Sequence, residues 1–446
     1  MHIVIIGNGV AGISTARHVR KISDHDITVI SAETDFFWSR TALMYIFMGH
    51  MQFEHTKPYE DWFWKKNRIN LLRKYVTSIN PDEKTISFGE GGSMKYDKLV
   101  LATGSRPNRF GWPGQDLAGV QGMVSYQDLR SMEQYARDTE RAVVVGGGLI
   151  GIEMAEMFHS RHIPITFLVR EDSFWNGVMP TEESSMINRE IRRNGIDLRL
   201  QTELKEILPD ENGRVRAVIT NTGEEIACQF VGLTAGVSAN VDLAASAGIE
   251  TGRAFKVDNY LETSVKDIYA AGDCAELRNP APNRRAIEAV WYTGKLMGPV
   301  LAKTLTGTPT AYKQSTWFNS AKFMDIEWQT YGTVTNKPAE GIKHLVWKHE
   351  DGTKLIRIAY EAESGAVTGF NTMGIRYRND VCLKWIDTQT HIEEVLKDLS
   401  LANFDPEFYT AHEADLIKRY NQLEGKSVSL RTSGKLKNVF RFLARA

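Results

Sequence analysis

The chain has 446 residues, 42% of them hydrophobic and 24% charged, and its formal net charge is −1. This length predicts two or three domains, and the near-zero charge excludes a whole-chain field that would attract nucleic acid or acidic lipid. The three cysteines form no C-x-x-C pair, which excludes a disulfide scaffold, and without a signal peptide or membrane span we expect a cytoplasmic protein.

The N-terminal segment HIVIIGNGVAG has the pattern of a dinucleotide-binding turn. A buried parallel strand is expected at 3–6, with a helix after the turn. Gly7 permits the tight turn, Gly9 lets the backbone approach a pyrophosphate, and Gly12 lets the helix pack closely on the strand. A second strand, DITVIS, precedes Glu33, which is spaced from the last glycine like an acid that binds an adenosine ribose. Together these features disfavour the alternative of a turn that binds no ligand.

The same device returns in the segment RAVVVGGGLIGIEMAE. An apolar strand precedes Gly146, Gly148 and Gly151, a helix is expected through about His159, and another strand follows in PITFLVRED. Two copies predict two dinucleotides. One copy suits a stored flavin cofactor, and the other suits a nicotinamide cofactor that comes and goes.

Two further apolar strands end in small and polar residues, in YDKLVLATGSRP (96–107) and VKDIYAAGDCAE (265–276). The carboxyl ends of strands are where open α/β sheets bind ligands. With GNGVAG and GGGLIG-x-E, these motifs make the chain resemble the FAD-dependent pyridine nucleotide–disulfide oxidoreductase superfamily over about residues 1–305. The segment FFWSRTAL (36–43) resembles most the branch of rubredoxin reductases, ferredoxin reductases and the flavoprotein part of assimilatory nitrite reductases.

The resemblance implies FAD and NADH or NADPH as cofactors, and it assigns site residues. Those implied to bind FAD are Gly7, Gly9, Val10, Ala11, Gly12, Glu33, Arg40, Ala102, Thr103, Gly104, Arg106, Gly272 and Asp273. Those expected to bind the nicotinamide dinucleotide are Gly146, Gly148, Leu149, Ile150, Gly151, Arg170 and Glu171. Simpler alternatives are a surface ion pair for Arg40, a helix N-cap for Asp273 and a solvated face for Glu153.

Two residues are implied to act where the nicotinamide meets the flavin. Glu153 would lie beside the approaching nicotinamide ring. Tyr45 stands near the place where the related branch often carries a lysine that reaches the flavin N5. Tyrosine donates a hydrogen bond but carries no charge at neutral pH, so the acceptor preference cannot be copied from the family.

The choice between NADH and NADPH rests on the end of the strand after the second turn. Val169 replaces the acid that usually selects NADH. Arg170 suits a 2′-phosphate, whereas Glu171 suits a 2′-hydroxyl and would repel the phosphate. We favour NADH weakly, with NADPH left open.

The order of the motifs predicts an α/β protein with two doubly wound Rossmann-type domains and an α+β C-terminal domain. The FAD domain is expected to be discontinuous, over 1–112 and 245–308, with the NAD(P)H domain inserted at 113–244. The third domain would cover 311–446. Its antiparallel strands are expected in STWFNSAKF, IKHLVWKH, KLIRIAYE and AVTGFNTMG, with helices from about 388.

The distribution of cysteines narrows the chemistry. Several branches of the superfamily use a redox cysteine pair or a single cysteine soon after the ribose-binding acid. Here the first cysteine in the chain is Cys228, and Cys274 is expected to serve packing. The flavin itself must therefore pass on the electrons, which disfavours disulfide reductase and peroxidase activity.

The C-terminal tail 425–446 is basic and carries no acid. An apolar helical stripe of Leu436, Val439, Phe440 and Leu443 is expected in it. Such a tail suits docking on its own domain, on an acidic electron carrier or on an anionic membrane surface, and these alternatives stay open.

The favoured function is an NAD(P)H-dependent FAD oxidoreductase that passes electrons to a small rubredoxin-like or ferredoxin-like protein. One alternative is a peripheral membrane NADH:quinone reductase, which only the tail supports. The other is a non-enzymatic, partner-binding flavoprotein of the apoptosis-inducing type, which calls for a basic face or a targeting peptide. No nucleic-acid partner is expected, and no metal site, since His50, Glu54 and His55 have poor ligand spacing. The oligomeric state is not predicted.

Overall fold

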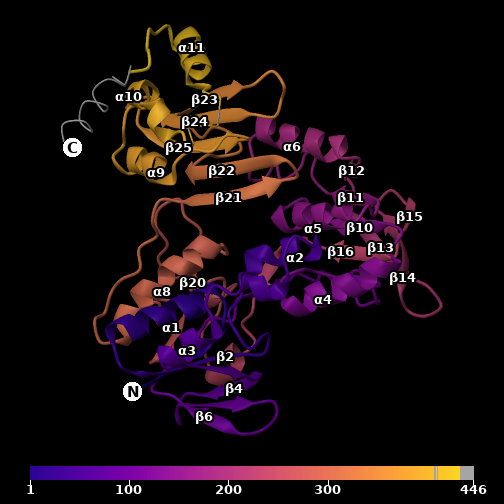
Figure 1. The fold of residues 1–446 in the computed structure, drawn as a ribbon, viewed down its shortest axis with the longest axis vertical. Helices are drawn as coiled ribbons and strands as arrows, with labels where there is room; N and C mark the ends of the chain where they lie inside the picture. The colour runs from indigo at the N-terminus through magenta and orange to yellow at the C-terminus, as the bar shows by residue number, and fades with distance from the viewer. Residues whose placement is uncertain (406–407, 409, 432–446) are drawn as a thin grey trace. The chain divides into compact units, whose positions relative to one another are not determined.

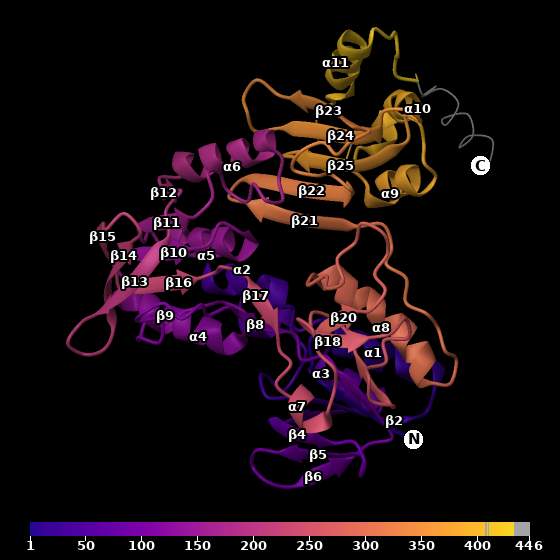
Figure 2. The same cartoon turned by 180° about the vertical axis from the view of Figure 1, so that it is seen from behind.

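The computed structural model of the protein describes residues 1–405, 408 and 410–431. The chain divides into two compact units, shown in Figures 1 and 2. The first comprises Met1–Asp172 and Gly195–Gln314, and the second comprises Ser173–Asn194 and the described residues from Ser315 onward. Most of the predicted basic tail, from residue 432 on, lies outside the described residues, and the three-domain boundaries stay a prediction.

The first unit contains a five-stranded parallel sheet that begins with the N-terminal strand. Its spatial order is β19 (Ile268–Ala270), β7 (Lys98–Leu101), β1 (His2–Ile6), β2 (Asp26–Ser31) and β3 (Ile69–Arg73). Because both faces of the sheet are covered, β1 is apolar at consecutive positions rather than at alternate ones. The chain leaves β1 towards β2 on one side and returns to β7 on the other, so the strand order reverses beside β1. Ligands bind at the carboxyl edge of such a reversal.

A second parallel sheet in the same unit repeats this design. Its order is β12 (Asp197–Leu200), β11 (Ile165–Val169), β10 (Ala142–Val145), β16 (Phe230–Leu233) and β9 (Val120–Gln121). Here the order reverses beside β10, which pairs with both β11 and β16. The prediction of two Rossmann-type α/β folds is confirmed.

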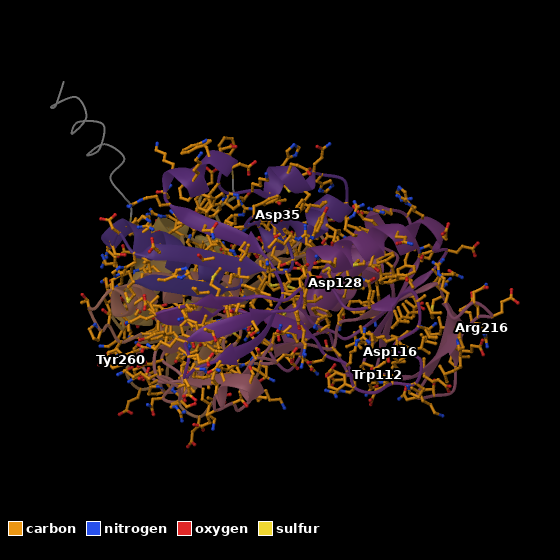
Figure 3. All side chains as sticks on the ribbon, turned by 90° about the horizontal axis from the view of Figure 1, so that it is seen from below. Asp35, Trp112, Asp116, Asp128, Arg216 and Tyr260 are labelled. Atoms are coloured by element: carbon orange, nitrogen blue, oxygen red, sulfur yellow. The ribbon has the colours of Figure 1, made fainter. Side chains whose placement is uncertain are left out.

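Helices and small sheets complete the first unit. Its helices are α1 (Val10–Ile22), α2 (Leu43–Phe47), α3 (Asp61–Lys66), α4 (Tyr126–Tyr135), α5 (Leu149–Ser160), α7 (Ala244–Ala247) and α8 (Trp291–Leu305). Its minor strands are β4 (Val76–Asn80), β5 (Thr85–Phe88), β6 (Ser93–Lys95), β8 (Ser105–Pro107), β13 (Leu204–Pro209), β14 (Val215–Thr220), β15 (Glu225–Ala227), β17 (Val237–Ala239), β18 (Phe255–Val257) and β20 (Ala275–Leu277). No described helix is both long and apolar enough to cross a membrane. Figure 3 shows the side chains of Trp112 and Asp116 on the turn between β8 and β9.

The second unit is built on an antiparallel sheet and confirms the predicted α+β class. The sheet order is β21 (Phe318–Phe323), β22 (Ile326–Gly332), β25 (Val367–Met373), β24 (Leu355–Glu361) and β23 (Ile342–Lys348). The helices are α6 (Thr181–Arg193), α9 (Asn379–Asp387), α10 (Ile392–Lys397) and α11 (Glu413–Glu424). The four predicted strands are all present, β22 was missed, and the helices begin at Asn379 rather than at about 388.

Helix α6 is fastened to this sheet by a buried ion pair. The Glu183 side chain on α6 is fully buried, and Arg357 on β24 is 3% exposed. The Arg357 Nε donates to Glu183 Oε1 at 2.7 Å, and its Nη2 donates to Oε2 at 2.8 Å. Glu182 adds a further bond to Arg357 at 2.6 Å. The segment between β11 and β12 of the second parallel sheet therefore folds with the C-terminal sheet.

Candidate functional site

The first glycine-rich turn has the geometry that its sequence requires. Gly7 adopts a φ of +117°, and a Cβ atom there would lie 2.0 Å from the carbonyl oxygen of Ala102. A Cβ on Gly12 would lie 2.1 Å from the carbonyl oxygen of Gly7. A Cβ on Gly9 would meet no atom within 4 Å, so this face of the turn opens onto free space. Gly7 and Gly12 therefore serve close packing, and Gly9 leaves room for a ligand.

The second turn has the same geometry. Gly146 also has a φ of +117°, and a Cβ on Gly151 would lie 2.2 Å from the carbonyl oxygen of Gly146. Gly148 faces open space, as Gly9 does. Each open glycine is the N-cap of the helix that follows, α1 or α5. The unpaired N–H groups at a helix start favour an anion such as a pyrophosphate.

A cavity of about 840 Å³ lies at the carboxyl edge of the first sheet. The predicted residues that line it are Gly7, Gly9, Val10, Ala11, Glu33, Arg40, Ala102, Thr103, Gly104, Gly272, Asp273, Ile150 and Glu153. Ile150 and Glu153 come from α5, so the second dinucleotide fold contributes part of the wall. This size lies in the upper range of small-molecule pockets. With the open face of Gly9, it fits an elongated dinucleotide such as FAD.

Sequence reasoning missed several residues that line this cavity. They are Phe37, Trp38, Met44, Met123, Val124, Ser125, Gln127, Asn240 and Trp291. Trp38 lies within the segment FFWSRTAL and Met44 directly follows it, and their apolar character was the available signal. The sequence around Met123–Gln127 gives no indication of a ligand site, because only folding of the chain brings the start of α4 to the cavity.

The other predicted site residues do not line the cavity. Gly12 packs inside the turn, and the three glycines of the second turn and Leu149 lie at the start of α5. Arg106 forms an ion pair with Asp242 at 2.9 Å, and Arg170 forms one with Glu171, also at 2.9 Å. The Tyr45 ring stacks against His50 with centroids 6.1 Å apart, whereas its neighbour Met44 lines the cavity. A role for Tyr45 at the flavin stays a prediction.

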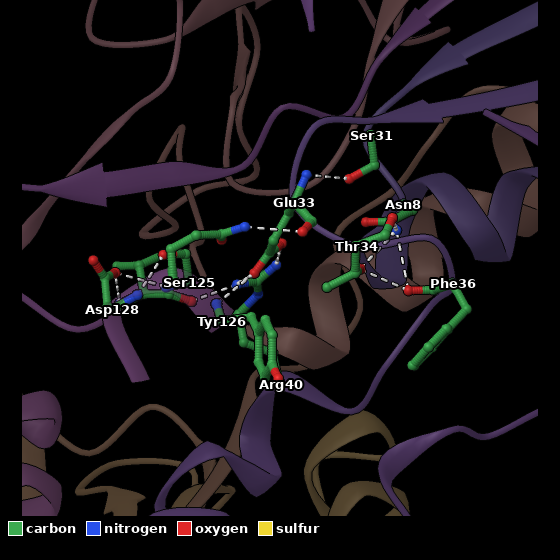
Figure 4. A network of polar contacts seen from close by, with 11 residues as sticks. Asn8, Ser31, Glu33, Thr34, Phe36, Arg40, Ser125, Tyr126 and Asp128 are labelled. Carbon is green, nitrogen blue, oxygen red and sulfur yellow. Dashed lines mark hydrogen bonds and ion pairs between the residues drawn. The ribbon is translucent and has the colours of Figure 1, made fainter. Parts of the chain in front are cut away.

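Glu33 and Arg40, which both line the cavity, meet directly (Figure 4). Arg40 donates from Nη1 to Glu33 Oε1 at 2.9 Å and from Nη2 to Oε2 at 2.5 Å. Arg40 Nη1 also donates to the carbonyl oxygen of Val124. The alternative of an ion pair for Arg40 is therefore present, but within the cavity wall rather than on an open surface.

Asp273 supplies a second carboxyl group to the cavity. It follows Gly272, whose φ of +81° turns the chain after β19. The Ser105 hydroxyl donates to Asp273 Oδ2 at 3.1 Å. Burial raises the pKa of this carboxyl, and that effect exceeds the lowering by the Ser105 bond and the nearby Arg40 charge. Asp273 is thus placed to accept a hydrogen bond from a ligand hydroxyl.

Glu153 is the carboxyl group that α5 turns into the cavity. Burial, and secondarily the charge of Glu156 one helical turn away, raises the pKa of Glu153 to about 7. A carboxyl with this pKa is partly protonated at neutral pH and can donate as well as accept a hydrogen bond. Among the described residues no cluster of three or more His, Cys, Asp or Glu side chains could hold a metal ion.

The family model described as pyridine nucleotide-disulphide oxidoreductase matches residues 1–314. The chain belongs to this family. Membership confirms the predicted class, an FAD-dependent oxidoreductase that uses a pyridine nucleotide, and the Gly9 cradle and the cavity fit the flavin cofactor. The choice between NADH and NADPH and the roles of the individual site residues stay predictions.

Relatives within the family differ in length and activity. Rubredoxin-NAD(+) reductase of Acinetobacter baylyi is 30% identical over 325 residues, which cover 70% of this chain and 80% of that protein. Nitrite reductase [NAD(P)H] of Bacillus subtilis is 27% identical over 355 residues, covering 78% of this chain. This chain spans only 43% of the length of that nitrite reductase.

A solved structure has the same fold. An NAD-dependent persulfide reductase from A. fulgidus superposes with a TM-score of 0.84, covering 95% of this chain and 84% of that chain. The two sequences are 23% identical. This likeness extends beyond residue 314 and confirms the fold class for nearly the whole chain.

Proposed function

We propose that this oxidoreductase transfers electrons from NADH or NADPH through FAD to a small redox protein of the rubredoxin or ferredoxin type. When bound, FAD would supply the redox chemistry that links a hydride-donating nicotinamide to a one-electron acceptor. The observation that carries the proposal is the shared wall of the cavity, where α5 of the second dinucleotide fold adds Ile150 and Glu153 to the residues of the first. Two dinucleotides bound on the two glycine turns would meet at that wall.

The residues of the chain would bind, align and exclude water. The start of α1 beside Gly9 would hold the pyrophosphate of FAD, Glu33 an adenosine hydroxyl and Asp273 the ribityl chain. The start of α5 beside Gly148 would hold the pyrophosphate of the nicotinamide cofactor. Ile150 and Glu153 would then border the nicotinamide ring. Alignment of the two rings accounts for catalysis without a dedicated acid or base.

The acceptor is tested by steady-state assays with NADH and NADPH against ferricyanide, rubredoxin, ferredoxin and a soluble quinone. We expect the protein to be yellow and to reduce ferricyanide and at least one of the two small proteins. Fast reduction of the quinone alone would favour the quinone reductase alternative. A flavin that no nicotinamide cofactor reduces would favour the non-enzymatic alternative.

Thiol chemistry should be dispensable for this activity. Cys228, Cys274 and Cys382 are all buried, and burial raises the pKa of the Cys228 thiol to about 12, which suppresses the reactive thiolate. A variant with all three cysteines changed to Ala is therefore expected to reduce ferricyanide with NADH at close to the wild-type rate. Loss of flavin reduction in a folded, FAD-loaded variant would contradict direct transfer from the flavin.

We expect a preference for NADH and assign it to Glu171. Its carboxylate pairs with Arg170 at 2.9 Å, so the cation that would attract a 2′-phosphate is already partly neutralised. Glu171→Gln should remove this neutralisation and lower the NADH-to-NADPH ratio of kcat/KM on the order of tenfold. The exposed Glu211→Gln is the control and should leave the ratio unchanged. A wild-type protein that already favours NADPH would refute this assignment.

A further inference from the structure

Two segments that lie far apart in the sequence are joined beside the cavity, as Figure 4 shows. The Tyr126 N–H donates to Glu33 Oε1 at 2.8 Å, and Gln127 Nε2 donates to the Glu33 carbonyl oxygen at 2.9 Å. The third link runs from Arg40 to the carbonyl oxygen of Val124. We call this group the α4 clamp; it consists of Glu33, Arg40, Val124, Tyr126 and Gln127.

The α4 clamp links the two dinucleotide folds. Glu33 follows β2 of the first sheet, whereas α4 lies between β9 and β10 of the second. Tyr126 is the first residue of α4, and its N-cap Ser125 accepts a bond from the Asp128 N–H. The Glu33 carboxylate therefore satisfies a backbone donor at a helix start, where the helix dipole also favours a negative charge.

Aromatic packing reinforces the same junction. The Tyr126 ring stacks on Phe53 with centroids 4.0 Å apart, and Trp38 meets Tyr126 edge-on at 6.3 Å. The Arg40 guanidinium lies over the Trp38 ring, 5.1 Å from its centroid. Trp38 and Arg40 both line the cavity, so a ligand there touches residues that also hold α4.

We propose that Glu33 is shared between the cofactor and α4, so that FAD bound in the cavity stabilises the start of α4 in the other dinucleotide fold. Arg40 is a positioning residue in this arrangement, because its two nitrogens orient the Glu33 carboxylate. The inference rests on the proposed function, since it requires FAD in the cavity. It goes beyond that function because it predicts that the second dinucleotide fold is more ordered when FAD is bound to the first.

Glu33 has the capacity for both partners. A carboxylate offers about four acceptor positions, and the bonds from Arg40 and Tyr126 occupy three of them. A ligand hydroxyl can therefore add to the clamp without displacing it. Covering Glu33, whose side chain is 16% exposed, would remove water and strengthen its bond to the Tyr126 N–H.

The test removes the backbone N–H of Tyr126, which donates to Glu33 in the α4 clamp. Proline is well tolerated at the first position of a helix, and Ser125 already has the extended backbone that a following proline requires. Tyr126→Pro thus deletes the donor to Glu33 together with the ring, whereas Tyr126→Ala deletes the ring alone. Comparing the two variants isolates the hydrogen bond.

Hydrogen exchange and FAD titration of the full-length protein are the two readouts. In the wild type and in Tyr126→Ala, FAD is expected to slow amide exchange along Tyr126–Tyr135. In Tyr126→Pro the slowing should be lost over the remaining amides, and FAD should bind on the order of tenfold more weakly than in Tyr126→Ala. Equal FAD affinity and equal exchange in the two variants would overturn the inference.

A second pair of variants covers the case in which Tyr126→Pro does not fold. Arg40→Met should raise amide exchange along α4 in the FAD-loaded protein, and Arg40→Lys should restore part of the protection. Unchanged exchange in Arg40→Met with FAD bound would refute the positioning role. A wild-type chain that binds no FAD would instead refute the proposed function, and the inference with it.

Discussion

Gly9→Glu is expected to give a folded protein that lacks FAD. Gly9 has a φ of −72°, which any residue adopts, and a Cβ there meets no protein atom within 4 Å. The added carboxylate would project into the space reserved for the pyrophosphate and repel its negative charge. We expect the FAD content of the purified variant to fall from about one per chain to near zero, measured by absorbance after denaturation.

The repeated turn supplies a matched control for this prediction. Gly148 also faces open space, with a φ of −124°. Gly148→Glu should keep its FAD but lose reduction of that FAD by NADH, because the charge now blocks the other pyrophosphate. A Gly9→Glu variant that retains full FAD, or a Gly148→Glu variant that loses it, would contradict the assignment of the two turns.

Replacing Glu153 by Gln should make the FAD-free protein more stable at pH 8 and not at pH 4. Burial raises the pKa of Glu153 from 4.5 to about 7, so the folded state disfavours the ionised form. Stability is therefore lost as the pH rises from about 4.5, where the unfolded carboxyl ionises, to about 7, where the folded one does. Glutamine does not ionise and escapes this loss.

The expected gain at pH 8 is on the order of 2 kcal/mol, because each pKa unit corresponds to about 1.4 kcal/mol and the carboxyl is partly exposed in the cavity. Thermal unfolding of both proteins at the two pH values measures it. The exposed Glu140→Gln serves as control and should show no such pH-dependent difference. A gain that is equal at pH 4 and pH 8 would show that Glu153 is not titrating.

The parts of the fold that follow from local sequence were predictable. The two glycine turns impose their own geometry, because Gly7 and Gly146 have a φ of +117° and a Cβ on Gly12 would lie 2.1 Å from the carbonyl oxygen of Gly7. The apolar runs before them become central strands, since only buried parallel strands are apolar at successive positions. The cavity residues contributed by these turns and strand ends were found for the same reason.

Features set by tertiary contacts were not predictable. Helix α8 begins at Trp291, after an extended N-cap at Val290, and Glu288 just before it pairs with Arg284 at 2.7 Å. The strand β22 was missed although Ile326–Gln329 alternate apolar and polar residues, because the alternation covers only four residues before Thr330 and Tyr331. The contact of Arg40 with Val124 depends on where α4 lies, which no local pattern encodes.

The early start of α9 has a similar cause. Its apolar residues Cys382 and Trp385 lie one turn apart and are buried in the core of the second unit. This pattern spans less than three turns, so periodicity alone gives it little weight. The helix forms because these residues pack into the core of the second unit, which contains the antiparallel sheet.

The buried Arg357–Glu183 pair bears on how this chain can be cut. The stretch that matches the family model ends at residue 314, yet it includes Glu183, whose guanidinium partner comes from beyond that point. A fragment ending there would leave α6 without the sheet that covers it. Breaking such a pair by removing one partner costs about 3–5 kcal/mol. A fragment therefore cannot be designed from the homology boundary, because Glu183 and Arg357 lie in two chain segments, 173–194 and 315 onward, that belong to one compact unit.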